Sequence, residues 1–296
     1  PYTTIVLYSI LPAILYFATV GFFVRVEAKR TDIQALEDEK LKVFEVLKTG
    51  GLPFLLPVSV LIGLLIYGFT PTYAAGISIV AVIVSSWLTP NRMGIKSIFD
   101  ALALGARNMV MTAVLLCSVG LVVNVIATAG IGNTFSLMIT NWSGNSLLIA
   151  IILVGLASLV LGMGVPVTAA YLITAVVAVP ALIHLGVNEI AAHMIVYWLS
   201  QDSNITPPVC IAAFAGATIA KANMWKTAFT SFKFAKFLYL GPFLFGYVPG
   251  FSLNGSAWDI IKAFVLILFG TYAYSWILSG IWFKPLKGMF KKAPVN

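Results

Sequence analysis

Long apolar runs, separated by short polar or charged segments, dominate the chain. Half-buried strands alternate polar and apolar positions, and these runs do not, which disfavours a β-barrel. A helix needs about 20 apolar residues to cross a bilayer, and several runs approach that length. We therefore predict an all-α polytopic membrane protein. The runs expected to be helical are Pro1–Val24, Leu52–Phe69, Tyr73–Leu88, Val110–Thr128, Leu147–Leu161, Ala169–Leu185 and Ile260–Phe283.

Composition supports lipid as the surrounding solvent. Of the 296 residues, 9% are charged and 60% are hydrophobic, whereas soluble domains have about 25% charged residues. A soluble globule of this composition would expose too much apolar surface. The net charge of +8 does not indicate nucleic-acid binding, because the basic residues lie between apolar runs. Four basic groups fall on one side of the membrane, as the positive-inside rule requires: Arg25–Lys48, Arg92–Arg107, Lys221–Lys236 and Lys284–Lys292.

Charge is concentrated in Arg25–Lys48, which holds six basic and six acidic residues. Apolar residues recur in it at roughly helical spacing, which predicts an amphipathic helix on the membrane surface; a solvated loop is the alternative. Asn91–Asn108 is a weakly amphipathic connector. We expect scaffold and surface-arm helices in 1–108, half of a transport domain in 109–236, and C-terminal helices with a basic tail in 237–296. Because no Met precedes the first residue, we expect a C-terminal piece of a longer protein.

The first of two breaks in the later apolar runs is Gly162–Thr168, a Gly- and Pro-containing turn between two short helical arms. A turn at membrane depth is tolerated only where protein buries it. The spacing therefore predicts a re-entrant hairpin over residues 145–185.

The second break is Ser200–Pro208, a polar stretch between two apolar halves that are each too short to span. Together the halves predict one discontinuous helix over residues 190–220. Pro207 and Pro208 are expected at the start of its second half, with Thr206 as the N-cap. The alternative for both breaks is an ordinary Gly/Pro kink, and Asp202 could instead lie in a water-filled vestibule.

Paired breaks at membrane depth indicate a transporter site. Unwound backbone frees carbonyl oxygens that suit a dehydrated cation such as Na⁺. Helices that restart there direct amides and a positive dipole end towards an anionic substrate. We therefore expect the two breaks to face each other across one site.

Other chemistry is weakly supported. An intramembrane protease would need a Ser–His pair or two aspartates, and Asp202 is essentially the single internal ionisable residue. A phosphate-binding loop of the Gly-x-x-x-x-Gly-Lys type is absent from the sequence, so the chain itself does not hydrolyse ATP. Glu189 and His193 are expected to pair near the external surface. An ion channel and a non-transporting membrane subunit stay open as alternatives.

Four motifs follow one another along the chain: Gly162-Met163-Gly164-Val165-Pro166-Val167-Thr168-Ala169-Ala170-Tyr171, Pro180-Ala181-Leu182, Ala191-Ala192-His193 and Ile205-Thr206-Pro207-Pro208-Val209. In this order they resemble the large membrane subunit of tripartite ATP-independent periplasmic (TRAP) transporters. The chain looks most similar to the TAXI-type form, in which the small and large subunits are fused. Leu11–Tyr16 resembles the link between the family's two repeats. Val167 departs from the family, which often has Thr there.

The resemblance implies the C-terminal inverted repeat of an elevator-type transporter in a bacterial or archaeal inner membrane. It implies Na⁺-driven uptake of organic acids delivered by a periplasmic substrate-binding protein. Further expected partners are the lipid bilayer and the small membrane subunit or N-terminal repeat missing from this chain. We expect no cofactor, with Na⁺ as the coupling ion. The expected Na⁺ ligands are Gly162, Met163, Gly164, Pro166, Ser203, Asn204, Thr206 and Pro207, and the expected substrate contacts are Thr168, Asp202 and Pro208.

Overall fold

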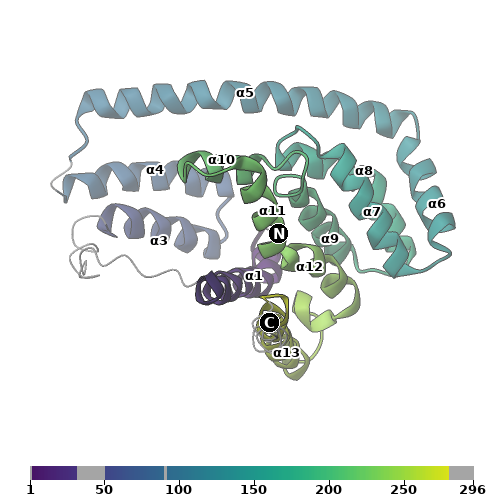
Figure 1. Ribbon diagram of the computed structural model, residues 1–296. Helices are drawn as coiled ribbons and strands as arrows, with labels where there is room; N and C mark the ends of the chain where they lie inside the picture. Colours follow the sequence, from purple (N-terminus) through teal and green to yellow (C-terminus); the bar gives the residue numbers. More distant parts are fainter. Residues whose placement is uncertain (1, 32–50, 90–91, 280–296) are drawn as a thin grey trace, which may run out of the picture. The chain divides into compact units, whose positions relative to one another are not determined.

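A computed structural model describes residues 2–31, 51–89 and 92–279, and regular structure in these residues is helical (Figure 1). The first helices are α1 (Tyr2–Thr31), α3 (Leu52–Ile66), α4 (Pro71–Trp87) and α5 (Ile95–Thr128). Then follow α6 (Ile131–Ser143), α7 (Leu147–Leu161), α8 (Val167–His184), α9 (Glu189–Asp202) and α10 (Ile211–Ile219). The last are α11 (Met224–Phe234), α12 (Lys236–Tyr247), the 3₁₀ turn η2 (Pro249–Ser252) and α13 (Ala257–Ser279).

Within the described residues, four helices are long and apolar enough to cross a membrane. They are Tyr2–Thr31, Ile95–Thr128, Val167–His184 and Ala257–Ile277. The shorter apolar helices are α3, α4 and α7. This architecture is that of an all-α polytopic membrane protein, as the apolar runs predict.

The chain divides into two compact units, whose boundaries fall inside α1, between Leu7 and Tyr8, and inside α5, between Leu115 and Leu116. In the first unit, α3 and α4 pack against each other as a helical hairpin. The Thr70 hydroxyl caps α4 by accepting a hydrogen bond from the Tyr73 amide at 3.4 Å. This confirms the predicted pair of helices joined at Thr70 and Pro71.

Two predicted boundaries are wrong because charge was interpreted as the end of a helix. The first helix continues past Arg25 to Thr31, so the surface helix predicted over Arg25–Lys48 does not begin there; its residues 32–50 lie outside the described residues. Likewise, the connector Asn91–Asn108 is not separate, because α5 is one helix of 34 residues. Charged residues at the membrane surface need not end a helix, because Lys, Arg and Glu are good helix formers.

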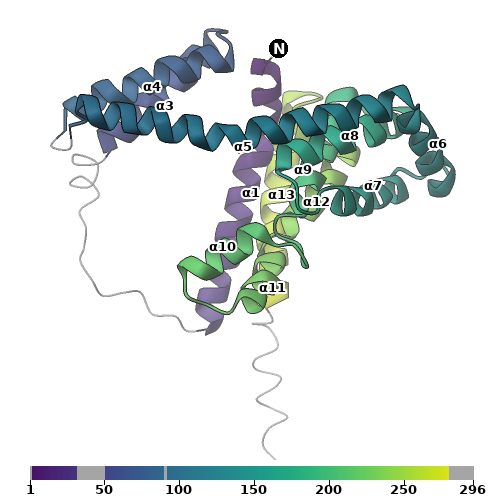
Figure 2. The ribbon, with the colours of Figure 1, turned by 90° about the horizontal axis from the view of Figure 1, so that it is seen from above.

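The second unit is built around α9, which packs against α7, α8 and α12. Its buried residues Ala192, Ile195 and Val196 lie in the largest apolar core of the described chain. Helices α12 and α9 approach each other closely where Gly241 lies directly on the Trp198 ring. Figure 2, viewed from above, shows α7, α8, α9 and α12 gathered together. This packing fixes α9, whose end carries the second break.

Candidate functional site at the two helix breaks

The first break is the tip of the α7–α8 hairpin. Helix α7 ends at Leu161, and the Gly162 amide donates to the Ser158 carbonyl at 2.8 Å. Gly164 has φ of +77°, a conformation that glycine adopts without strain. Helix α8 begins at Val167, with Pro166 as an N-cap that supplies no side-chain hydrogen bond. The amides of the first turn of α8 therefore have no acceptor within the helix.

The second break is shorter than predicted. Ser200, Gln201 and Asp202 belong to α9, and the non-helical segment runs from Ser203 to Cys210. The Ser200 hydroxyl donates to the Val196 carbonyl at 2.7 Å. This polar side chain therefore has its hydrogen-bond partner within the helix. The Ala212 amide at the start of α10 donates to the Asn204 carbonyl at 3.1 Å. This bond ties the second half-helix back to the unwound segment.

Thr206 is not the N-cap of the second half-helix, which corrects the sequence prediction. Helix α10 begins at Ile211, and its N-cap is Cys210 in the left-handed region. Pro207 precedes Pro208 and is therefore disfavoured in the helical region, so a helix does not start directly after Thr206. The Thr206 hydroxyl instead donates to the Asp202 carbonyl at the end of α9. Thr206 therefore closes the first half-helix.

The two breaks touch. A Cβ atom placed on Gly162 would lie 2.9 Å from Ser203 Oγ and 3.2 Å from Ser203 Cβ. Ser203 is 2% exposed. The predicted proximity of Gly162–Thr168 and Ser203–Pro208 is thus confirmed at this one contact, whereas the Na⁺ ion between them stays a prediction.

Buried polar atoms without hydrogen-bond partners occur in the segments that meet there. They are Ser158 Oγ in α7, Asp202 Oδ1 at the end of α9, and Asn204 Nδ2 in the unwound segment. Asp202 is 2% exposed, and it forms no salt bridge with a described residue. Burying an unpaired carboxylate is costly. Both acceptors and a donor are therefore left for a ligand.

Only some of the predicted site residues share this buried position. Gly162, Asp202 and Ser203 are buried, whereas Asn204, Thr206 and Pro207 are partly exposed. The remaining predicted residues are exposed: Met163, Gly164, Pro166 and Thr168 at the hairpin tip, and Pro208 in the second break.

Two tyrosines that the sequence analysis missed border the site. The Tyr239 hydroxyl, on α12, lies 2.5 Å from the Thr206 hydroxyl. The Tyr16 ring of α1 packs edge-on against Trp198 of α9, one helical turn before Asp202. No sequence signal distinguishes these two tyrosines from interfacial anchors, because their proximity arises from tertiary packing.

His193 has a different contact from the one predicted. Its Nδ1 atom is hydrogen-bonded to the Tyr171 hydroxyl of α8 at 2.8 Å. The Tyr197 ring packs edge-on against Tyr171. The predicted partner Glu189 forms no salt bridge with His193 in the chain as described. This contact joins α8 to α9.

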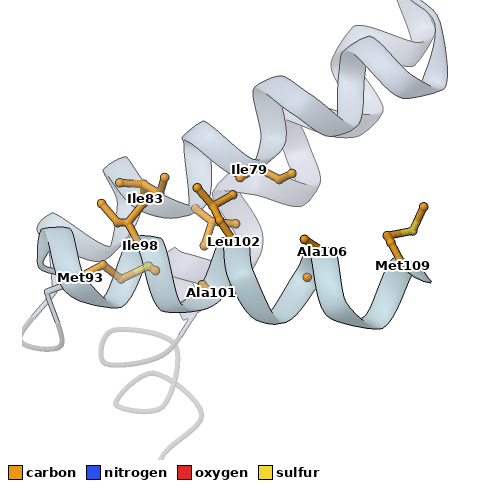
Figure 3. A pocket seen from close by; sticks show the side chains of 10 residues that line it. Ile79, Ile83, Met93, Ile98, Ala101, Leu102, Ala106 and Met109 are labelled. Atoms are coloured by element: carbon orange, nitrogen blue, oxygen red, sulfur yellow. The ribbon is translucent and has the colours of Figure 1, made fainter. Parts of the chain in front are cut away.

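A separate hollow lies in the first unit, between α4 and the start of α5 (Figure 3). It encloses about 470 Å³. Its lining is apolar: Ile79, Val82, Ile83, Met93, Ile98, Ala101, Leu102, Gly105, Ala106 and Met109. Such a groove offers no ligand for an ion or an organic acid and does not compete with the helix breaks as the site.

Replacing Gly162 with alanine should push the two breaks apart. Its Cβ would lie 2.8 Å from the Ser158 carbonyl oxygen and 2.9 Å from Oγ of the buried Ser203, and overpacking of this kind costs about 1–3 kcal/mol. We expect a lower thermal unfolding temperature and faster hydrogen exchange at residues 203–206 in the purified full-length transporter.

Gly155→Ala is the matched control on the same hairpin arm, because its Cβ would meet a single side-chain atom, Leu199 Cδ2, at 3.4 Å. If Gly162→Ala matched this control in both measurements, the contact between the breaks would not exist in solution.

The fold is that of a multi-pass helical membrane protein, with unpartnered buried polar atoms at two interruptions between helices. The family described as "Tripartite ATP-independent periplasmic transporter, DctM component" matches residues 1–251. The chain belongs to this family, so it is a membrane permease component of a TRAP transporter. Comparison with curated proteins and with solved structures gives no match. The family is one of transporter membrane components, and it is not an enzyme family.

Proposed function

We propose that this chain is the C-terminal half of a Na⁺-coupled permease that takes up organic acids delivered by a periplasmic substrate-binding protein. The observation that carries the proposal is the contact between Gly162 and Ser203, with unpartnered buried polar atoms in the same segments. Each of those atoms has a chemical preference, and together they favour a cation beside an anion.

The acceptor atoms favour the cation. Ser158 Oγ and Asp202 Oδ1 are oxygen atoms, and hard cations prefer oxygen ligands. Asp202 brings a negative charge that offsets the cost of dehydrating Na⁺. A carbonyl oxygen has two lone pairs, so the Asn204 carbonyl can accept the Ala212 amide and still bind an ion. The described residues contain no cluster of three or more His, Cys, Asp or Glu side chains, which a transition metal would favour.

The donor groups favour an anion. The first turn of α8 presents amides without helical acceptors, and the exposed Thr168 side chain lies in that turn. Asn204 Nδ2 is a buried donor without an acceptor. An organic acid's carboxylate would satisfy these donors. Asp202 would repel that carboxylate, so we assign Asp202 to the cation rather than to the direct substrate contacts predicted for it, with the bound Na⁺ between the two charges.

The wider assembly is part of the same proposal. Family membership implies a periplasmic binding protein and a small membrane subunit. We propose the TAXI-type form, in which the small and large subunits are fused, and we propose that an N-terminal repeat completes the large subunit. The site-bearing helices would then move as one body in an elevator mechanism, in the inner membrane of a bacterium or archaeon.

Uptake by the complete transporter tests the proposal. The full-length protein and its binding protein would be reconstituted in liposomes and offered radiolabelled mono- and dicarboxylates, with either NaCl or choline chloride outside. We expect uptake against a concentration gradient that requires external Na⁺ and the binding protein. Uptake unchanged by choline would refute Na⁺ coupling. Conductance without accumulation would indicate a channel, and failure of every acid to enter would support a non-transporting subunit.

A further inference from the structure

A hydroxyl chain links three segments of the second unit. Tyr239 Oη of α12 lies 2.5 Å from Thr206 Oγ1 in the unwound segment, and Thr206 Oγ1 donates to the Asp202 carbonyl at the end of α9. The amides of Ile205 and Thr206 donate to the same carbonyl, at 3.2 Å and 2.8 Å. The end of α9, the unwound segment and α12 are therefore joined at one point.

The direction of the Tyr239–Thr206 hydrogen bond follows from proton counting. A threonine hydroxyl has one proton, and a carbonyl oxygen can only accept. Since Thr206 gives its proton to the Asp202 carbonyl, the Tyr239 hydroxyl must donate to Thr206. The Thr206 oxygen then uses one of its two lone pairs for Tyr239 and keeps the other.

Helix α12 holds Tyr239 in a fixed place. The Phe232 ring packs on the Tyr239 ring with centroids 5.2 Å apart. Two residues further on, Gly241 lies directly against the Trp198 ring of α9. Phe237 and Phe245, one turn on either side, pack edge-on against the same ring. Because α12 cannot slide along α9 without breaking these contacts, Tyr239 is a rigid donor.

We propose that Tyr239 is a positioning residue of the transport site, which donates a hydrogen bond to Thr206 and so fixes the free lone pair of the Thr206 hydroxyl for a bound cation. The inference rests on the proposed function and adds α12 as a third wall of the site. Two hydrogen bonds leave the Thr206 hydroxyl one direction for its remaining lone pair. A ligand oriented in advance binds more tightly, because ordering it costs nothing at the moment of binding.

Tyr239→Phe tests the inference, because it removes the hydroxyl and keeps the ring that packs on Phe232. The probe is Na⁺ alone, titrated against choline at constant ionic strength into the purified full-length transporter in nanodiscs. Hydrogen exchange of peptides covering residues 200–206 is the readout. The half-saturating Na⁺ concentration for protection should rise about threefold to tenfold, which corresponds to one lost hydrogen bond. Tyr247→Phe, on the exposed end of α12, is the matched control and should behave as wild type.

A double-mutant cycle with Thr206→Ala shows whether Tyr239 acts through Thr206. We expect Thr206→Ala to weaken Na⁺ protection at least as much as Tyr239→Phe, and the double variant to equal Thr206→Ala. If Tyr239→Phe weakened protection equally in both backgrounds, or left it unchanged in the wild type, the positioning role would be overturned.

The same experiment separates this inference from the proposed function. If choline and Na⁺ gave identical exchange in the wild type, the Na⁺ coupling would fail. The hydrogen bond would then be judged in choline alone, where Tyr239→Phe should speed exchange at residues 204–206 through loss of the Thr206 anchor. Unchanged exchange in choline would also overturn the Tyr239–Thr206 hydrogen bond itself.

Discussion

Gly241→Ala should destabilise the second unit strongly, although it adds a single methyl group. The new Cβ would lie 2.2 Å from Cε3 and Cζ3 of the Trp198 ring, which is too close for any non-bonded contact. Trp198 is 8% exposed and surrounded by aromatic rings, so it cannot move aside. Overpacking costs about 1–3 kcal/mol, and we expect the upper end of that range. Thermal unfolding of the purified protein in detergent, followed by tryptophan fluorescence, measures the change.

Gly120→Ala in α5 is the matched control, because no atom lies within 4 Å of its Cβ position. Alanine favours a helix over glycine by about 1 kcal/mol, so this variant should be neutral or slightly stabilised. The pair Gly241→Ala with Trp198→Phe should recover part of the loss, since the second ring of the indole is gone. Equal unfolding temperatures for Gly241→Ala and Gly120→Ala would contradict the observed packing of α12 on α9.

The helices and the two breaks could be predicted because their signals are local. The run Leu147–Leu161 is apolar throughout and stops at a Gly-rich turn, and the structure gives α7 the same bounds. Polar residues flanked by apolar halves likewise predicted the interruption after α9. Boundaries set by charge alone were wrong, because a charged residue such as Arg25 continues a helix into water.

The arrangement of the site could not be predicted in full, because much of it depends on contacts between distant segments. Tyr239 and Thr206 are hydrogen-bonded although they lie 33 positions apart in the sequence. The residues next to Tyr239 in the chain do not indicate that it belongs to a polar site. The prediction for Thr206 was wrong because its hydroxyl could serve two roles, as the N-cap of the second half-helix or as a donor to the end of α9. The Asp202 carbonyl at the end of α9 accepts the hydrogen bond of this hydroxyl, and two consecutive prolines delay the next helix.

Asp202→Asn should change stability and ion binding in different ways. Asparagine has nearly the same shape as aspartate without the charge. In Na⁺-free buffer we expect the unfolding temperature to stay unchanged or rise, because a buried carboxylate without a cationic partner among the described residues is removed. Na⁺ should stabilise the wild type, and this gain should need at least about tenfold more Na⁺ in the variant, since an uncompensated cation is costly to bury. Thermal unfolding against Na⁺ concentration measures both.

Asp100→Asn makes the same chemical change at an exposed position of α5 and should leave the Na⁺ dependence intact. Asp202→Glu keeps the charge but moves the oxygens outward by one methylene, so it should retain part of the Na⁺ response. A purely structural carboxylate predicts the reverse order, with Asp202→Asn less stable in Na⁺-free buffer and unaltered in its response to Na⁺. That result would remove Asp202 from the cation site and leave the Ser158 hydroxyl and the carbonyl oxygens of the two breaks to hold the ion without a formal charge.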